Sequence, residues 1–115
     1  MAVYDLEDRT LRFAQNVRAF TKNLPKTLEN VEDIKQLVRA SASIGANYIE
    51  ANESLGAKDK IMRLKISKKE SKEARFFLRL VDTGESNILK SQKEELIKEA
   101  TELMNILGAI INKLT

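Results

Sequence analysis

The side chains that most often perform catalysis are scarce in this sequence. Histidine and cysteine are both absent, which excludes Ser-His-Asp catalysis, cysteine nucleophiles, disulfides and zinc sites built on either residue. A serine without a histidine to activate it is better interpreted as a packing residue, and this applies to Ser41, Ser43, Ser67 and Ser71. A carboxylate dyad or a metal site made only of carboxylates stays open. We expect no enzyme, no catalytic residue, no metal site and no cofactor.

The carboxylates Glu50 and Glu53 are the best candidates for acid–base chemistry. Paired carboxylates can act as acid and base, but only where a cleft perturbs a pKa. Nothing in the surrounding sequence indicates such a cleft. We therefore expect these glutamates to form ion pairs across a turn, with Arg63 or Arg75 of the following helix.

Basic residues provide a stronger pattern. Between positions 58 and 79 there are nine lysines and arginines but only three acidic residues, a local charge of +6 in a chain whose net charge is +3. On a helix, seven of the nine share a face about 120° wide, and one aromatic residue lies among them. This predicted nucleic-acid-binding face comprises Lys58, Lys65, Lys68, Lys69, Lys72, Arg75, Phe76 and Arg79.

Two interpretations of this face are open. Clustered cations favour binding to a phosphate backbone, because each neutralised phosphate releases counterions. The ring of Phe76 could then stack on an unpaired base. The alternative is an ordinary lysine-rich surface that keeps the protein in solution, since lysine is mostly exposed in folded proteins.

The same segment carries a second apolar strip, offset from its core-facing stripe by about a quarter turn. A helix in a bundle needs one buried stripe, so a second one predicts a further partner. The alternative is a wide core stripe that another helix of the same chain covers. We favour a homo-oligomer interface made of Met62, Ile66, Phe77 and Leu80.

Four helices must position these residues. Apolar residues recur at spacings of three and four over four segments, which predicts helices at about residues 6–23, 31–55, 58–82 and 91–114. We interpret residues 1–115 as one domain, because a chain of this length has room for a single core. Short connections predict an all-α, antiparallel, up-down-up-down four-helix bundle.

Local signals predict where these helices begin and end. Asp5 and Asn30 are good N-cap residues. Ser91 and Glu94 have the spacing of a capping box, and Gly56 is placed to end the second helix. Asn52, on the apolar face of the second helix, is interpreted as a buried residue that fixes helix register.

The predicted core stripes differ in the size of their side chains. Large residues form the stripe of the first helix: Leu6, Thr10, Phe13, Val17, Phe20 and Leu24. Small residues occupy the middle of the stripe of the third helix: Leu64, Ser67, Ser71, Ala74, Leu78 and Val81. The centre of the second helix is also small, so we expect these two helices to pack closely.

Composition places the chain among soluble cytoplasmic proteins. Apolar residues make up 43% and charged residues 32%. No run approaches the 18 or so consecutive apolar residues of a membrane span. The first residues lack the basic and then apolar pattern of a signal peptide.

Several segments resemble one protein family. Residues 39–51 (RASASIGANYIEA) resemble its most recognisable motif, and residues 69–75 (KESKEAR) followed by Phe77 resemble its second signature. Residues 4–7 (YDLE) resemble its N-terminal region. This is the family of four-helix bundle proteins encoded within intervening sequences of bacterial 23S rRNA genes. Many members carry a larger aromatic pair where this chain has two phenylalanines.

The resemblance implies a ring-like homopentamer that is associated with RNA. It names no catalytic residue. A related bundle, the accessory protein of diversity-generating retroelements, is a basic pentamer that binds a reverse transcriptase and nucleic acid. The leading hypothesis is therefore an oligomeric, non-enzymatic protein that binds structured RNA. The alternative is a protein-interaction scaffold whose partner is another protein, such as a reverse transcriptase.

Overall fold

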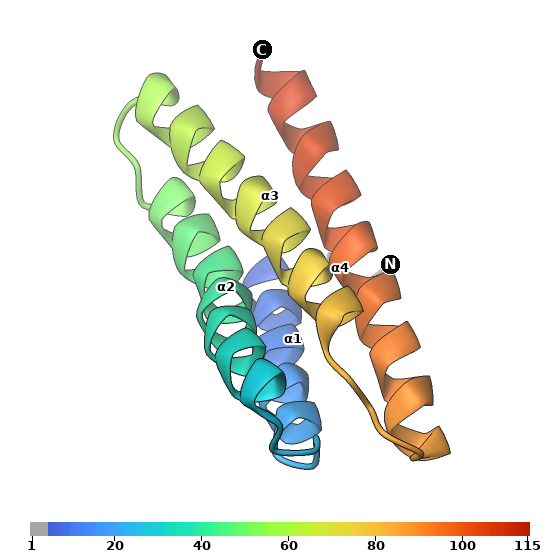
Figure 1. Ribbon diagram of the computed structural model, residues 1–115. Coiled ribbons are helices and arrows are strands. Elements are labelled where there is room, and N and C mark those ends of the chain that lie inside the picture. Colours follow the sequence, from blue (N-terminus) through green and yellow to red (C-terminus); the bar gives the residue numbers. More distant parts are fainter. Residues whose placement is uncertain (1–4) are drawn as a thin grey trace.

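The computed structural model describes residues 5–115, so Tyr4 of the N-terminal motif lies outside the described residues. Four α-helices make up the described chain: α1 (Leu6–Thr21), α2 (Leu28–Asn52), α3 (Ala57–Leu80) and α4 (Asn87–Leu114) (Figure 1). Residues 5–115 contain no β-strand. The predicted all-α, four-helix class is confirmed.

The start of α2 differs from the prediction. Its N-cap is Thr27, whose hydroxyl accepts a hydrogen bond from the backbone N–H of Asn30 at 3.1 Å. Asn30 was the predicted cap, but its side chain is used in a tertiary contact. It is 1% exposed, and its amide donates to the carbonyl oxygens of Pro25 and Asp82 and accepts from the Asp82 N–H. Asn30 therefore ties the first helix connection to the end of α3.

Two further predicted boundaries are wrong. Helix α4 begins at Asn87, with Ser86 as its N-cap, so Ser91 lies inside the helix and forms no capping box. Ser86 is an equally good cap and comes first, and its hydroxyl accepts from the N–H of Leu89 at 3.1 Å. Gly56 does not end α2, which already stops at Asn52; it is instead the N-cap of α3, in extended conformation.

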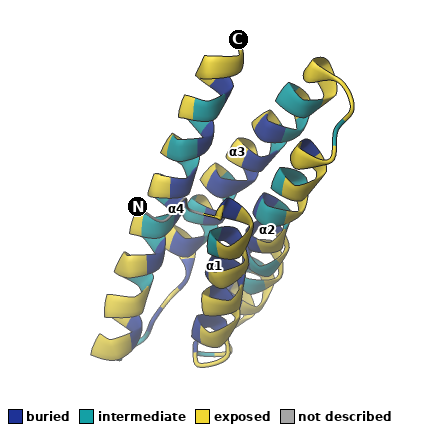
Figure 2. Cartoon of the chain, turned by 180° about the vertical axis from the view of Figure 1, so that it is seen from behind, coloured by how far each residue is buried: buried dark blue, intermediate teal, exposed yellow. Residues whose placement is uncertain are grey.

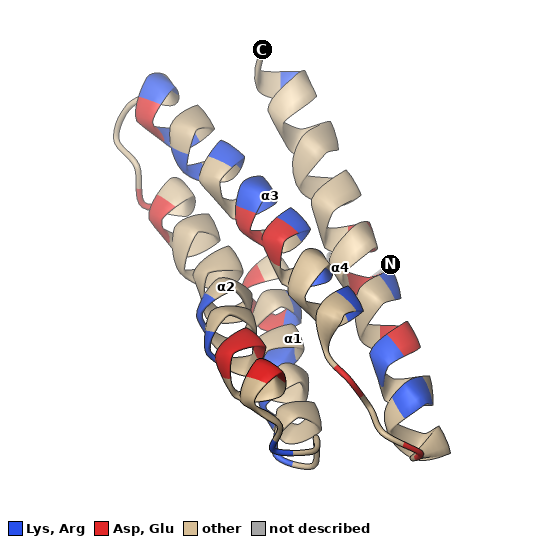
Figure 3. Cartoon of the chain, in the orientation of Figure 1, with Lys and Arg blue, Asp and Glu red and all other residues tan. Residues whose placement is uncertain are grey.

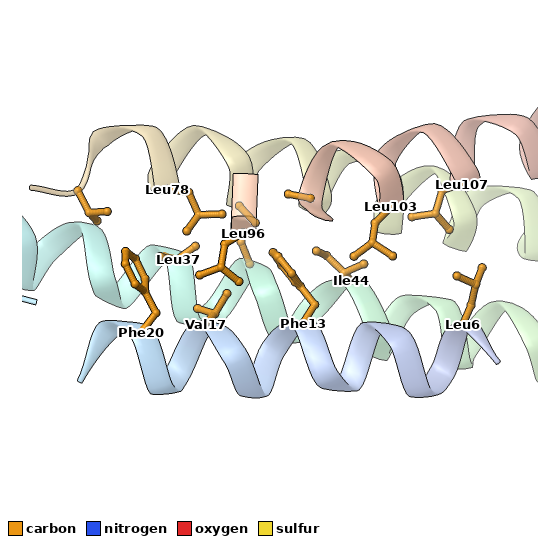
Figure 4. Close-up of a cluster of buried hydrophobic side chains, with 14 of the residues drawn as sticks. Leu6, Phe13, Val17, Phe20, Leu37, Ile44, Leu78, Leu96, Leu103 and Leu107 are labelled. Atoms are coloured by element: carbon orange, nitrogen blue, oxygen red, sulfur yellow. The ribbon is translucent and has the colours of Figure 1, made fainter. Parts of the chain in front are cut away.

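The core lies along the axis between the helices (Figure 4). Every residue of the predicted stripes of α1 and α3 is buried, as predicted. The stripe of α2 is buried in its middle, at Leu37, Ser41 and Ile44, but Ile49 and Asn52 are exposed near its end. In Figure 2 the buried residues face inward on each helix and the exposed residues face outward.

Each helix packs against two others. Helix α1 contacts α2 and α4, and α3 contacts the same two helices. Contacts between α2 and α3 join residues whose numbers rise on one helix as they fall on the other, so this pair is antiparallel. The Ser67 hydroxyl donates to the Ile44 carbonyl oxygen at 2.7 Å, whereas Arg63 donates to Asn47 nearer the connecting loop. A serine hydroxyl can reach a neighbouring helix backbone only where the two helices lie close together.

The predicted polar contacts near the α2–α3 loop are wrong. Arg63 bonds Asn47 and Arg75 donates to the Thr101 hydroxyl at 3.4 Å, so neither pairs with Glu50 or Glu53 among the described residues. Glu50 and Glu53 are both exposed instead. Asn52 is also exposed rather than buried, and its amide donates to Glu7 at 3.2 Å.

The approach of α1 to α2 depends on a glycine. A Cβ atom at position 45 would lie 2.8 Å from Oγ1 and 3.2 Å from Cβ of Thr10. Thr10 has little freedom to move, because it is 2% exposed and its hydroxyl donates to the Leu6 carbonyl oxygen at 2.7 Å. By contrast, a Cβ at Gly108 would meet only the end of the Lys68 side chain, at 3.3 Å.

These two glycines give a matched test. We expect Gly45→Ala to lower the free energy of unfolding by about 1–3 kcal/mol, because the methyl group overpacks the α1–α2 contact. Gly108→Ala should leave stability unchanged or raise it by up to about 1 kcal/mol, through helix propensity. Urea denaturation followed by circular dichroism measures both. Equal effects at the two positions would show that the Thr10 contact does not set the helix separation.

Candidate nucleic-acid interface

The predicted nucleic-acid-binding residues lie along the side of α3 that extends from α4 to the solvent. We call these eight residues the basic face. Six of its seven cations are exposed, the exception being Arg75, which is half-buried beside α4. Phe76 is 57% exposed. Figure 3 shows basic residues along most of the length of α3.

The acidic residues of α3 are turned away from the basic face, towards α2. Glu70 is buried, and its carboxylate accepts from Arg39 of α2 at 3.3 Å. Glu73 accepts a hydrogen bond from the same guanidinium. Asp59 accepts from the Ser54 hydroxyl at 2.9 Å. The three carboxylates of α3 are thus engaged at the α2 side, and the lysines on the opposite side keep their full charge towards solvent.

The basic face borders an uncharged part of α4. Residues 103–112 include no lysine, arginine, aspartate or glutamate, and the corresponding stretch of α4 is tan in Figure 3. Arg75 bridges the two helices by its hydrogen bond to Thr101. The Lys68 side chain reaches over Gly108. The positive charge of α3 therefore meets no opposing charge from this part of α4.

Two carboxylates of α4 that precede this uncharged stretch form ion pairs with α1. Arg9 of α1 donates to Glu99 at 2.8 Å and to Glu102 at 2.9 Å. The hydrogen bond to Glu99 raises the pKa of the Arg9 guanidinium above its ordinary value, against the lowering effect of partial burial. Arg9 therefore joins both carboxylates of α4 to α1. Sequence reasoning missed this ion-pair cluster, because its residues are about 90 positions apart.

The four residues of the predicted oligomer interface divide into two pairs. Met62 and Leu80 are 49% and 50% exposed. Ile66 is half-buried, and Phe77 is half-buried and packs against the core of its own chain. The strip therefore has an exposed side chain near each end of α3, with two partly covered side chains between them.

A groove between α1 and α4 was not indicated by the sequence. It has a volume of about 710 Å³ and is lined by Phe13, Phe20 and Leu96, with Arg12 and Glu95 among its polar residues.

Within residues 5–115, no group of three or more acidic side chains is placed to hold a metal ion. No helix in that range is both long and apolar enough to span a bilayer.

Comparisons with known proteins point to one family. A family model described as 23S rRNA-intervening sequence protein matches residues 4–109. A crystal structure of a protein of unknown function from the S23 ribosomal protein family of Bacteroides thetaiotaomicron is similar, with a TM-score of 0.78 and 31% identity. The match covers 91% of this chain and 96% of the other. No curated protein matches the chain.

The Arg39 cluster gives a test of how the charges of α3 are separated. We expect Arg39→Gln to lower the free energy of unfolding by about 1–2 kcal/mol, because Glu70 is buried and would lose its charged partner. The control is Lys35→Gln, which breaks only the exposed pair of Lys35 with Glu32, at 3.4 Å. That change should cost less than about 0.5 kcal/mol. Thermal and urea denaturation measure both, and a loss no larger than that of the control would contradict the assignment.

Proposed function

We propose that this chain, which belongs to the 23S rRNA-intervening sequence protein family, is a non-enzymatic cytoplasmic protein that binds RNA through the basic face of α3. One observation carries the proposal: the charges of α3 are sorted by side. The carboxylates Glu70 and Glu73 are paired with Arg39 on the α2 side, whereas Lys65, Lys69 and others are exposed on the opposite side.

The physical basis is the attraction of a phosphate backbone to a row of unpaired cations. Each phosphate that a lysine neutralises releases bound counterions, which makes binding favourable at low salt and weaker at high salt. A lysine-rich surface that serves only solubility does not require its acidic neighbours to be neutralised by another helix. The family description also names 23S rRNA, and for this reason we propose RNA rather than DNA as the ligand.

We also propose that the chain assembles into a ring-like homo-oligomer, with the antiparallel up-down-up-down bundle as its subunit. The support is the exposure of two apolar residues of α3, Met62 near its start and Leu80 at its end. A ring would repeat the basic face around its circumference. Several weak contacts to one RNA then act together, and the overall affinity exceeds that of a single face.

Replacing three central cations tests the RNA proposal. We expect a K68E/K69E/K72E variant to stay folded, because all three side chains are exposed, and to lose at least about tenfold in affinity for RNA near physiological salt. The neutral variant K68Q/K69Q/K72Q should reduce the slope of log affinity against log salt by about 2 for a single strand. Fluorescence anisotropy with a labelled single-stranded RNA measures both.

The matched control reverses the same number of charges elsewhere. Lys22, Lys35 and Lys113 are exposed on three other helices or helix ends, and a K22E/K35E/K113E variant changes the net charge equally. It should bind RNA more tightly than the α3 variant. Equal losses would show that only net charge matters. Absence of wild-type binding at low salt would refute the proposal, and recovery of a protein partner without RNA from the native host would favour the scaffold alternative.

Introducing lysines into the apolar strip tests whether the chain forms an oligomer through it. We expect the wild type to have the mass of several 13.0 kDa chains by light scattering, and M62K/L80K to shift towards a single chain. The control L28K places a lysine at an apolar side chain that is 76% exposed on α2, outside the strip. It should leave the mass unchanged. A wild type that is monomeric at high concentration would contradict the proposed ring.

A further inference from the structure

Phe76 is an exposed aromatic residue in the middle of a charged surface. Its 57% exposure contrasts with Phe13 and Phe20, which are 1% and 2% exposed in the core. The ring therefore contributes little to the packing of its own chain. An aromatic ring that is exposed among cations is available to contact a ligand, and burying it there would be favourable.

The ring of Phe76 is supported by its neighbour. Its centroid lies 5.3 Å from that of Phe77, and the two planes meet at 81°, an edge-to-face arrangement. Phe77 in turn is half-buried and packs against the core. Aromatic pairs of this geometry contribute more to stability than the burial of their surface alone would. Phe76 thus contacts a ring that packs against the core, and it remains 57% exposed.

Cations of the basic face lie on both sides of this ring along α3. Lys72 precedes it by four positions and Arg79 follows by three, so each is its neighbour on the helix surface one turn away. Lys69 lies two turns before it. All three side chains are exposed. A base that stacks on Phe76 would therefore have its flanking phosphates within reach of positive charge on either side.

From this arrangement we infer that the basic face takes RNA with unpaired nucleotides, and that Phe76 is the platform on which one base stacks. The inference rests on the proposed function and names the class of RNA. In a duplex both faces of every internal base are covered by neighbouring pairs, so the ring has nothing to stack on. Single strands and loops expose base faces, and stacking on an aromatic side chain tolerates any sequence.

The first test compares an oligouridine single strand with a blunt-ended RNA duplex at one salt concentration. Phe76→Leu keeps an apolar side chain but removes the aromatic face, and Phe76→Trp keeps an aromatic face. We expect F76L to bind the single strand roughly tenfold more weakly than wild type. It should bind the duplex as wild type does. F76W should retain the affinity of the wild type for the single strand.

The second test is spectroscopic. The chain contains no tryptophan, so F76W introduces a single tryptophan at the proposed contact, which can be excited selectively over the tyrosines. Its emission should be quenched when oligouridine binds and should change little with the duplex. The control is Leu11→Trp on α1, at a side chain with a similar exposure of 54%. Its emission should change little with either RNA.

Three results would overturn the inference, and they are distinguishable. If the wild type binds neither RNA at low salt, the proposed function fails and the inference fails with it. If it binds both RNAs equally and F76L matches it, the basic face binds RNA but Phe76 is no stacking platform. If F76L changes the mass of the assembly while RNA affinity stays that of wild type, Phe76 belongs to a protein interface.

Discussion

The close packing of α3 against α2 is the contact on which the surfaces of this protein depend. Small residues such as Ala40, Ser41 and Ala74, all fully buried, let the two helices approach. The Ser67 hydroxyl then reaches the backbone of Ile44 on the other helix. Such contacts fix the rotation of α3 about its own axis. Once that rotation is set, each remaining side of α3 has a defined environment.

That rotation separates charge on a single helix. The side towards α2 carries Glu70 and Glu73, which share one guanidinium from Arg39. The side away from the core carries the lysines, next to a stretch of α4 without charged residues (Figure 3). A helix with nine basic residues and three acidic ones would present a mixed surface if all twelve faced solvent. Here Glu70 and Glu73 are paired with α2, whereas six of the seven cations of the basic face are exposed.

Much of the fold could be predicted from the sequence, because its apolar spacing is regular. The stripes of α1 and α3 are buried in full, from Leu6 to Leu24 and from Leu64 to Val81. Helix boundaries were less predictable, because Ser86 and Ser91 are equally good caps when only neighbouring residues are considered. At the start of α2, Asn30 was predicted as the N-cap in place of Thr27. The distinction is visible only in three dimensions, where the Asn30 side chain is hydrogen-bonded to the backbone of Asp82.

The candidate site was predictable to a similar degree and for a similar reason. The angular positions of Lys65, Lys72 and Phe76 follow from helix geometry, so their common face could be deduced. The partners of Glu70 and Glu73 could not, because they depend on the register between two helices. The same holds for the cluster of Arg9 with Glu99, which joins opposite ends of the chain. The support that Phe77 gives to Phe76 is likewise visible only in three dimensions.

Photo-crosslinking of the wild-type protein to an RNA hairpin, followed by mass spectrometric mapping of the crosslinked residues, tests the central claim most directly. The account predicts crosslinks concentrated between residues 65 and 79, on the basic face of α3, and diminishing as salt is raised. Crosslinks confined to α1 or α2, or a pattern that salt does not change, would contradict it.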